Sequence, residues 1–214
     1  METTAALPNM IQRVLLFCGI LAPLLTFGID RVGGRLLKGY SFTAQSMSEL
    51  SASGASTRPL VVPLTVVSSA LMIAFGVGVL QADHAFLPRV VGGLVIGNAV
   101  AGLIATVFFP THFGERPAFG TANVIIMLLS VVCFVLAMVV GAAAFRGWFR
   151  ALSIAIPVAY VLLAVLRFTT ASPAAEGAAV SMVGAQERTM GYSFLLWVMA
   201  LAIHLLLLTG KGVD

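Results

Sequence analysis

Long apolar runs separated by shorter polar segments dominate this chain. A helix needs about 20 mostly apolar residues to cross the hydrocarbon core of a bilayer, and six runs approach that length. They predict helices over residues 11–29, 60–80, 90–109, 122–145, 151–167 and 192–209. The shorter runs fit a bilayer that thins locally. We therefore expect an all-α polytopic membrane protein: one integral membrane domain over residues 1–214, folded as a bundle of six transmembrane helices.

The composition supports the same class of protein. Hydrophobic residues make up 60% of the 214 positions and charged residues only 9%, whereas a soluble domain carries about a quarter of charged residues. The formal net charge is +4, but the cations are spread singly between apolar runs, so we expect no nucleic-acid partner. Cys18 and Cys133 both lie inside apolar runs and are expected to pack as small hydrophobic residues.

Six spans place both termini on one side of the membrane. The short loop "RGWFR", residues 146–150, carries two arginines, and short cytoplasmic loops are the ones enriched in Lys and Arg. We therefore expect a multi-pass cell-membrane protein with both termini in the cytoplasm. The first run contains Pro23 and lacks a small-x-small cleavage site, which favours a retained helix over a cleaved signal peptide.

Small residues form a stripe in one span, and few polar residues interrupt the spans. Gly93, Gly97 and Ala101 recur every four residues and share one helix face, which predicts a close contact with another helix of the bundle; the alternative is a homodimer seam. Asn98 and His204 are the polar residues at mid-membrane depth. Such residues are functional candidates, although a single Asn more often forms one interhelical hydrogen bond.

The most polar segment follows the first span. Residues 41–57 hold six Ser and two Thr but one charged residue, Glu49. Ser46 followed by Glu49 predicts a capping box, and Gly54 fits a helix stop, so we expect a short interfacial helix over residues 47–53. This structural interpretation leaves other hydroxyl groups unexplained, at Ser48, Ser51 and Ser53.

Two further polar loops are expected on the same side, opposite the termini. They contain "THFGER" and "QERT", and together with the hydroxyl-rich segment they predict a polar site. Cross-pairing of acids and arginines would clamp the loops together, whereas a free arginine would bind a lipid phosphate. The candidate site residues are Ser48, Glu49, Ser51, Ser53, Arg58, His112, Glu115, Arg116, Glu187 and Arg188.

Catalytic and metal-binding motifs are weak. His112 and Glu115 have a spacing that suits two metal ligands, but zinc usually takes at least three protein ligands. Neither a nucleophile elbow nor a zinc-protease helix motif is present. We expect no metal and no other cofactor.

Three segments carry a family resemblance. "YSFTAQSMSELSASGASTRPL" after the first span, "FFP" closing the third and "AQERTMGYSFLLW" opening the sixth resemble an uncharacterised family of six-helix membrane proteins, known as domain of unknown function nine-nine-eight. The resemblance covers nearly the whole chain and implies a fold and a topology but no activity.

The leading functional hypothesis is binding of a lipid or small amphiphile at the polar face, with membrane lipids as partners. One alternative is a membrane-embedded, hydrolase-like enzyme acting on lipids through Glu49 and His112. Another is a small transporter working as a dimer, with Asn98 and His204 as its mid-membrane polar residues.

Overall fold

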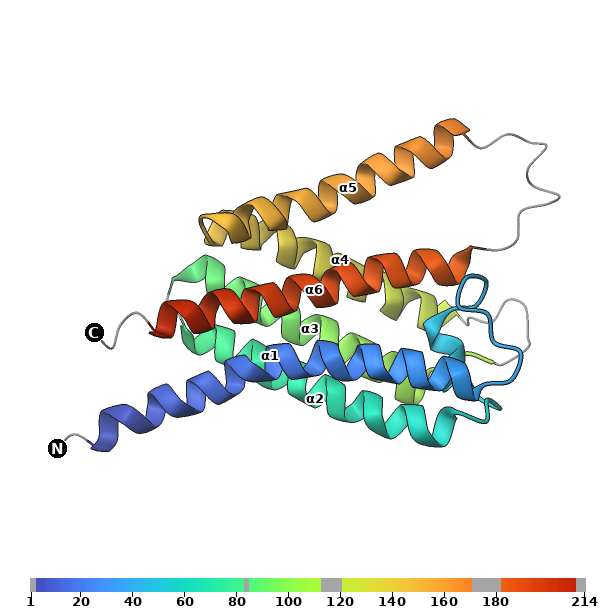
Figure 1. Cartoon of the computed structure of the whole chain (residues 1–214), viewed down its shortest axis with the longest axis horizontal. Coiled ribbons are helices and arrows are strands. Elements are labelled where there is room, and N and C mark those ends of the chain that lie inside the picture. The colour runs from blue at the N-terminus through green and yellow to red at the C-terminus, as the bar shows by residue number, and fades with distance from the viewer. Residues whose placement is uncertain (1–2, 83–84, 113–120, 171–181, 211–214) are drawn as a thin grey trace.

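The computed structural model describes residues 3–82, 85–112, 121–170 and 182–210 (Figure 1). Within these ranges the chain forms six α-helices and one short 3₁₀ helix, which confirms the predicted all-α class. The elements are α1 (Thr3–Leu36), η1 (Met47–Ser51), α2 (Arg58–Ala82), α3 (Phe86–Phe108), α4 (Thr121–Ala144), α5 (Trp148–Thr170) and α6 (Val183–Gly210).

The helices have the length and composition of membrane spans. Among the described residues, α1, α2, α3, α4 and α6 are each long and apolar enough to cross a membrane, and α5 contributes a shorter apolar stretch, Trp148–Leu162. Successive helices run up and down, so α1 begins and α6 ends at the same end of the bundle (Figure 1). The chain is therefore a multi-pass membrane protein. The polar loop after α1 lies at the opposite end.

Two helices extend well beyond their predicted limits. The structure continues α1 to Leu36 rather than residue 29, and begins α6 at Val183 rather than residue 192. Asp30 and Arg188 therefore lie inside helices and not in loops. Both helices continue beyond the apolar pattern, α1 at its end and α6 at its start. The charged side chains of these added turns are satisfied by each other and by loop backbone.

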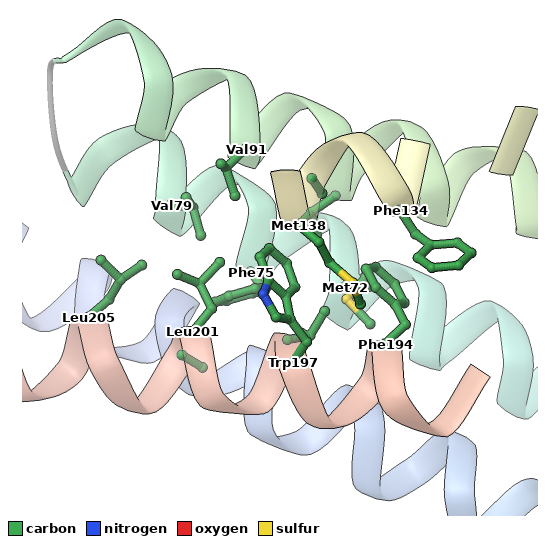
Figure 2. Packing of buried hydrophobic residues seen from close by; sticks show 14 of the residues in the cluster. Met72, Phe75, Val79, Val91, Phe134, Met138, Phe194, Trp197, Leu201 and Leu205 are labelled. Atoms are coloured by element: carbon green, nitrogen blue, oxygen red, sulfur yellow. The ribbon is translucent and has the colours of Figure 1, made fainter. Parts of the chain in front are cut away.

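The core is built from side chains of several helices around Trp197 (Figure 2). Trp197 of α6 is completely buried, as are Phe75 of α2 and Met138 of α4. A buried indole N–H needs an acceptor, and Trp197 Nε1 donates to Ser153 Oγ of α5 at 2.8 Å. This bond links α5 to α6, and the Tyr160 hydroxyl of α5, which lies 3.0 Å from the carbonyl oxygens of Thr189 and Met190, makes a second link between the same helices.

Small residues allow the closest contact between α2 and α3. A Cβ atom on Gly92 would lie 2.9 Å from the Gly76 carbonyl oxygen, so neither glycine has room for a side chain. The predicted stripe is only partly used: Ala101 is buried and Gly97 faces Cys133 of α4, but open space surrounds Gly93. The α2–α3 seam is thus one residue away from the predicted position, while α4 meets the stripe at Gly97.

Candidate functional site

Asp30 of α1 and Arg188 of α6 form a buried ion pair at the end of the bundle opposite the termini. Arg188 Nη2 lies 2.8 Å from Asp30 Oδ1, and Arg188 Nε lies 3.0 Å from Asp30 Oδ2. Asp30 is 1% exposed and Arg188 is 6% exposed. A two-point arginine–carboxylate pair is strong and directional, so it fixes the rotation and depth of α1 relative to α6.

Arg188 uses all its remaining donors inside the protein. Nη1 lies within hydrogen-bond distance of three carbonyl oxygens, those of Phe42, Gln45 and Gly184. Nη2 also donates to the phenol oxygen of Tyr40. A guanidinium has five N–H groups, and each has an acceptor here. Arg188 is therefore not available to an external ligand.

Two tyrosines form hydrogen bonds to the Asp30–Arg188 ion pair. Tyr192 of α6 donates its hydroxyl hydrogen to Asp30 Oδ2. Tyr40 accepts from Arg188 and donates to the Ser46 carbonyl oxygen at 2.7 Å. Burial raises the pKa of Tyr40 to about 12, and the Arg188 hydrogen bond and charge oppose that rise only partly. We call Asp30, Tyr40, Arg188 and Tyr192 the polar cluster.

The first turn of α6 also holds the loop after α1 by its backbone. Glu187 Oε2 accepts the Met47 N–H at 3.0 Å, and the Ala185 N–H donates to the Thr43 carbonyl oxygen at 3.0 Å. The second bond satisfies one of the donors left unpaired at a helix N-terminus. Glu187 and Arg188, predicted in a loop, therefore act from a helix and together fasten residues 42–47.

Glu49 occupies the capping position expected of it. Ser46 donates its backbone N–H to Glu49 Oε1 at 3.1 Å, and Gln45 Nε2 donates to Glu49 Oε2 at 2.7 Å. The helix that follows is a five-residue 3₁₀ turn, shorter than the predicted 47–53 helix. Gly54 has a φ of +89°, a conformation that favours glycine.

The hydroxyl groups of this segment mostly serve its own backbone. Ser51 Oγ donates to the Ser48 carbonyl oxygen at 3.0 Å, and Thr57 Oγ1 donates to the Leu50 carbonyl oxygen at 2.7 Å. Ser48 Oγ lies 2.8 Å from Ser46 Oγ. Such bonds replace helix or sheet bonds in irregular backbone. Arg58 likewise donates from Nη1 to the Ser51 carbonyl oxygen.

The loop after α3 joins the hydroxyl-rich segment by its backbone. Ser53 N–H donates to the Thr111 carbonyl oxygen at 2.8 Å, forming an isolated bridge between Ser53 and His112. The His112 side chain is exposed. Glu115 and Arg116 lie outside the described residues.

Arg31 lies next to the polar cluster and, like Arg188, contacts aromatic rings, but it differs from Arg188 in its hydrogen bonds. Its guanidinium lies 5.1 Å from the ring centre of Phe27, 5.4 Å from that of Phe42 and 5.8 Å from that of Tyr192. Arg31 forms no ion pair with a described residue. Its sequence neighbour Asp30 pairs with Arg188, and both Asp30 carboxylate oxygens already accept hydrogen bonds. Arg31 is held by aromatic faces, and no described residue accepts its N–H groups.

The two mid-membrane polar residues are both packed within the bundle. Asn98 Nδ2 of α3 donates to the Ser130 carbonyl oxygen at 3.0 Å and lies 2.8 Å from Ser130 Oγ, which links α3 to α4. The His204 ring stacks on Phe149 at 5.4 Å and meets Trp148 edge-on at 5.5 Å.

In the described part of the chain, no three His, Cys, Asp or Glu side chains gather closely enough to hold a metal ion. Among the described residues, this end of the bundle instead offers hydrogen bonds, the internally neutralised Asp30–Arg188 pair, and Arg31, whose N–H groups have no acceptor there.

Sequence patterns anticipated that these loops share one end of the bundle, but not how they pair. Asp30, Tyr40 and Tyr192 were absent from the candidate residues, and Arg31 gave no sign of its aromatic setting. The available signal was a carboxylate directly after the first span and an arginine shortly before the last, since charges at membrane depth usually pair.

Comparison with known proteins identifies the family to which the chain belongs. The chain matches no curated protein and no solved structure. A family model matches residues 20–204, which include every helix of the bundle in whole or in part and both halves of the Asp30–Arg188 pair. The chain therefore belongs to the family described as "Protein of unknown function (DUF998)".

Proposed function

We propose that this membrane protein binds a lipid or small amphiphile at the end of the bundle opposite its termini, on the extracytoplasmic side. The supporting observation is the contrast between two neighbouring arginines. Both arginines lie over aromatic rings. Arg188 is buried and all its N–H groups have acceptors within the protein, whereas Arg31 is half-buried and has no described carboxylate partner.

The position of Arg31 favours an amphiphile over a water-soluble ligand. Phe27, one turn below Arg31 on α1, is 45% exposed, and so is much of the outer surface of α1. In a multi-pass membrane protein such exposed apolar side chains contact lipid tails. A ligand that reaches Arg31 from this side therefore needs a polar head and an apolar tail.

The two alternative functions have less support. Glu49, the proposed acid or base of an enzyme, has both carboxylate oxygens occupied as a cap. Asn98, a proposed transport residue, has its amide nitrogen occupied by Ser130. Both residues thus have a structural role that needs no ligand.

Native mass spectrometry of the purified full chain tests the proposal. We expect bound lipid on the wild-type protein and a marked loss of it in Arg31→Gln. Arg150→Gln is the control, because Arg150 is an exposed arginine at the other end of the bundle. Wild-type protein that retains no lipid, or an Arg31→Gln variant that retains the same amount, would refute lipid binding at this site.

A further inference from the structure

We infer that the bound lipid is anionic and carries a phosphate headgroup, held by Arg31 and Arg35 on one face of α1 and by Lys38 in the turn that follows the helix. This inference deepens the proposed function and rests on it. Arg31 and Arg35 are four residues apart in α1 and therefore lie on the same helix face, and Lys38 follows two residues after the helix ends at Leu36. Arg35 and Lys38 are exposed, and Arg31 is half-buried.

The same face of α1 continues toward the N-terminus of the helix as an apolar stripe. Exposed side chains recur at three- and four-residue steps below the cations. These residues are Val14, Phe17, Leu21 and Leu24. One helix face therefore presents an apolar surface and then two arginines, which matches the order of groups in an anionic lipid.

Gly28 lies between these two parts of the stripe. It is one turn below Arg31, and a Cβ atom at this position would have no atom within 4 Å. The helix surface is therefore indented where the headgroup of a lipid joins its chains. A side chain at this position would fill the indentation without meeting any other part of the protein.

The charge of the stripe is not neutralised within the described part of the chain. The nearby acids are occupied: Asp30 pairs with Arg188, Glu49 caps η1 and Glu187 accepts the Met47 N–H. Arg35 lies in the last turn of α1, where a cation also favours the helix dipole. That role does not account for Arg31, which lies a turn earlier and is fixed by aromatic rings.

The chemistry of Arg31 suits a phosphate. A guanidinium presents paired N–H groups that match two phosphate oxygens, and an arginine stacked on rings keeps those groups free at its edge. A basic residue near a membrane surface strengthens binding of anionic lipids by about fivefold. Three such residues at this end of α1 are therefore expected to give a clear preference over zwitterionic lipids.

The test compares phosphatidylglycerol with phosphatidylcholine of identical acyl chains, each titrated onto the purified full chain and followed by native mass spectrometry. We expect tighter binding of phosphatidylglycerol. Arg35→Gln and Lys38→Gln should each reduce that preference by about fivefold, and Arg31→Gln should abolish it. The charge control is Arg89→Gln, an exposed arginine at the opposite end of the bundle.

A steric pair of variants tests the position of the ligand. Gly28→Leu should weaken phosphatidylglycerol binding, whereas Gly93→Leu, which also projects into open space but from α3, should leave it unchanged. Equal weakening in both variants, or in neither, would overturn the assignment to this stripe.

The outcomes separate the two proposals. Equal binding of both lipids, still lost in Arg31→Gln, would overturn the anionic preference while leaving lipid binding intact. Absence of both lipids would overturn both proposals. Displacement of phosphatidylglycerol by inorganic phosphate would assign the site to free phosphate and overturn the lipid, whereas a bound lipid that excess phosphate leaves in place supports it.

Discussion

Arg188 and Asp30 meet through two hydrogen bonds of 2.8 and 3.0 Å although 158 positions separate them in the chain. The pair joins the first and last helices of the bundle, and Arg188 also fastens the loop after α1 through the carbonyl oxygens of Phe42 and Gln45. The Arg188 guanidinium thus connects α6 to both α1 and the loop after α1 at this end of the protein.

We expect Asp30→Asn and Arg188→Gln to be strongly destabilising. Each leaves the partner's charge buried without its counter-ion, which typically costs about 3–5 kcal/mol of unfolding free energy. Thermal or denaturant unfolding in detergent measures the loss.

The Asp30→Asn/Arg188→Gln double variant extends this test. It leaves no unpaired charge, so it should lose less stability than the sum of the single variants. Additive losses, or single variants as stable as the wild type, would contradict a direct pair.

The loop contact at Tyr40 predicts a loss of stability at high pH. An unfolded chain releases a tyrosine proton near pH 10, whereas the pKa of Tyr40 in the folded protein is about 12. The contribution of the neutral phenol is therefore complete below about pH 10 and falls as the pH rises towards 12. Unfolding midpoints measured across this range should drop more steeply for the wild type than for Tyr40→Phe; parallel curves would argue against the buried phenol.

Glu49 should behave as a cap and not as a catalytic acid. Glu49→Ala removes the acceptor for the Ser46 and Gln45 N–H groups and should cost about 0.5–2 kcal/mol. Glu49→Gln keeps an acceptor and suits the same capping position, so most of the stability should remain. If both variants unfold at the wild-type midpoint, the cap does not stabilise this segment.

The α2–α3 contact predicts that substitutions at two adjacent glycines affect stability differently. Gly92→Leu would push a side chain against the Gly76 carbonyl oxygen, and overpacking of this kind costs about 1–3 kcal/mol. Gly93→Leu points into open space and should leave the unfolding midpoint close to that of the wild type. Equal losses of stability at the two positions would contradict the rotation of α3 about its axis seen in the structure.

The apolar pattern was sufficient to predict the six helices, because membrane spans must satisfy their backbone internally and are long and apolar. It was insufficient at the two places where polar side chains extend a helix, the end of α1 and the start of α6. Hydropathy ends both spans early there, which placed Asp30 and Arg188 in loops and hid their pairing. The capping role of Glu49 was visible because both partners lie within three positions in the chain.

The aromatic setting of Arg31 could not be predicted for a related reason. Phe27 is a neighbour on the same helix, but Phe42 comes from the loop and Tyr192 from α6. Only the folded arrangement of three segments distinguishes this arginine from others at membrane edges. The same applies to Gly76 and Gly92, whose mutual contact depends on the rotation of two helices.

The most direct test of this account is the change in unfolding midpoint when phosphatidylglycerol is added to wild-type protein and to Arg31→Gln. A ligand that binds the folded state raises its stability. We predict that both proteins unfold at similar temperatures without lipid, since Arg31 makes no hydrogen bond to a described residue, and that only the wild type gains stability when lipid is added. An Arg31→Gln variant that gains as much as the wild type, or that is already unstable without lipid, would contradict the division between a structural Arg188 and a ligand-binding Arg31.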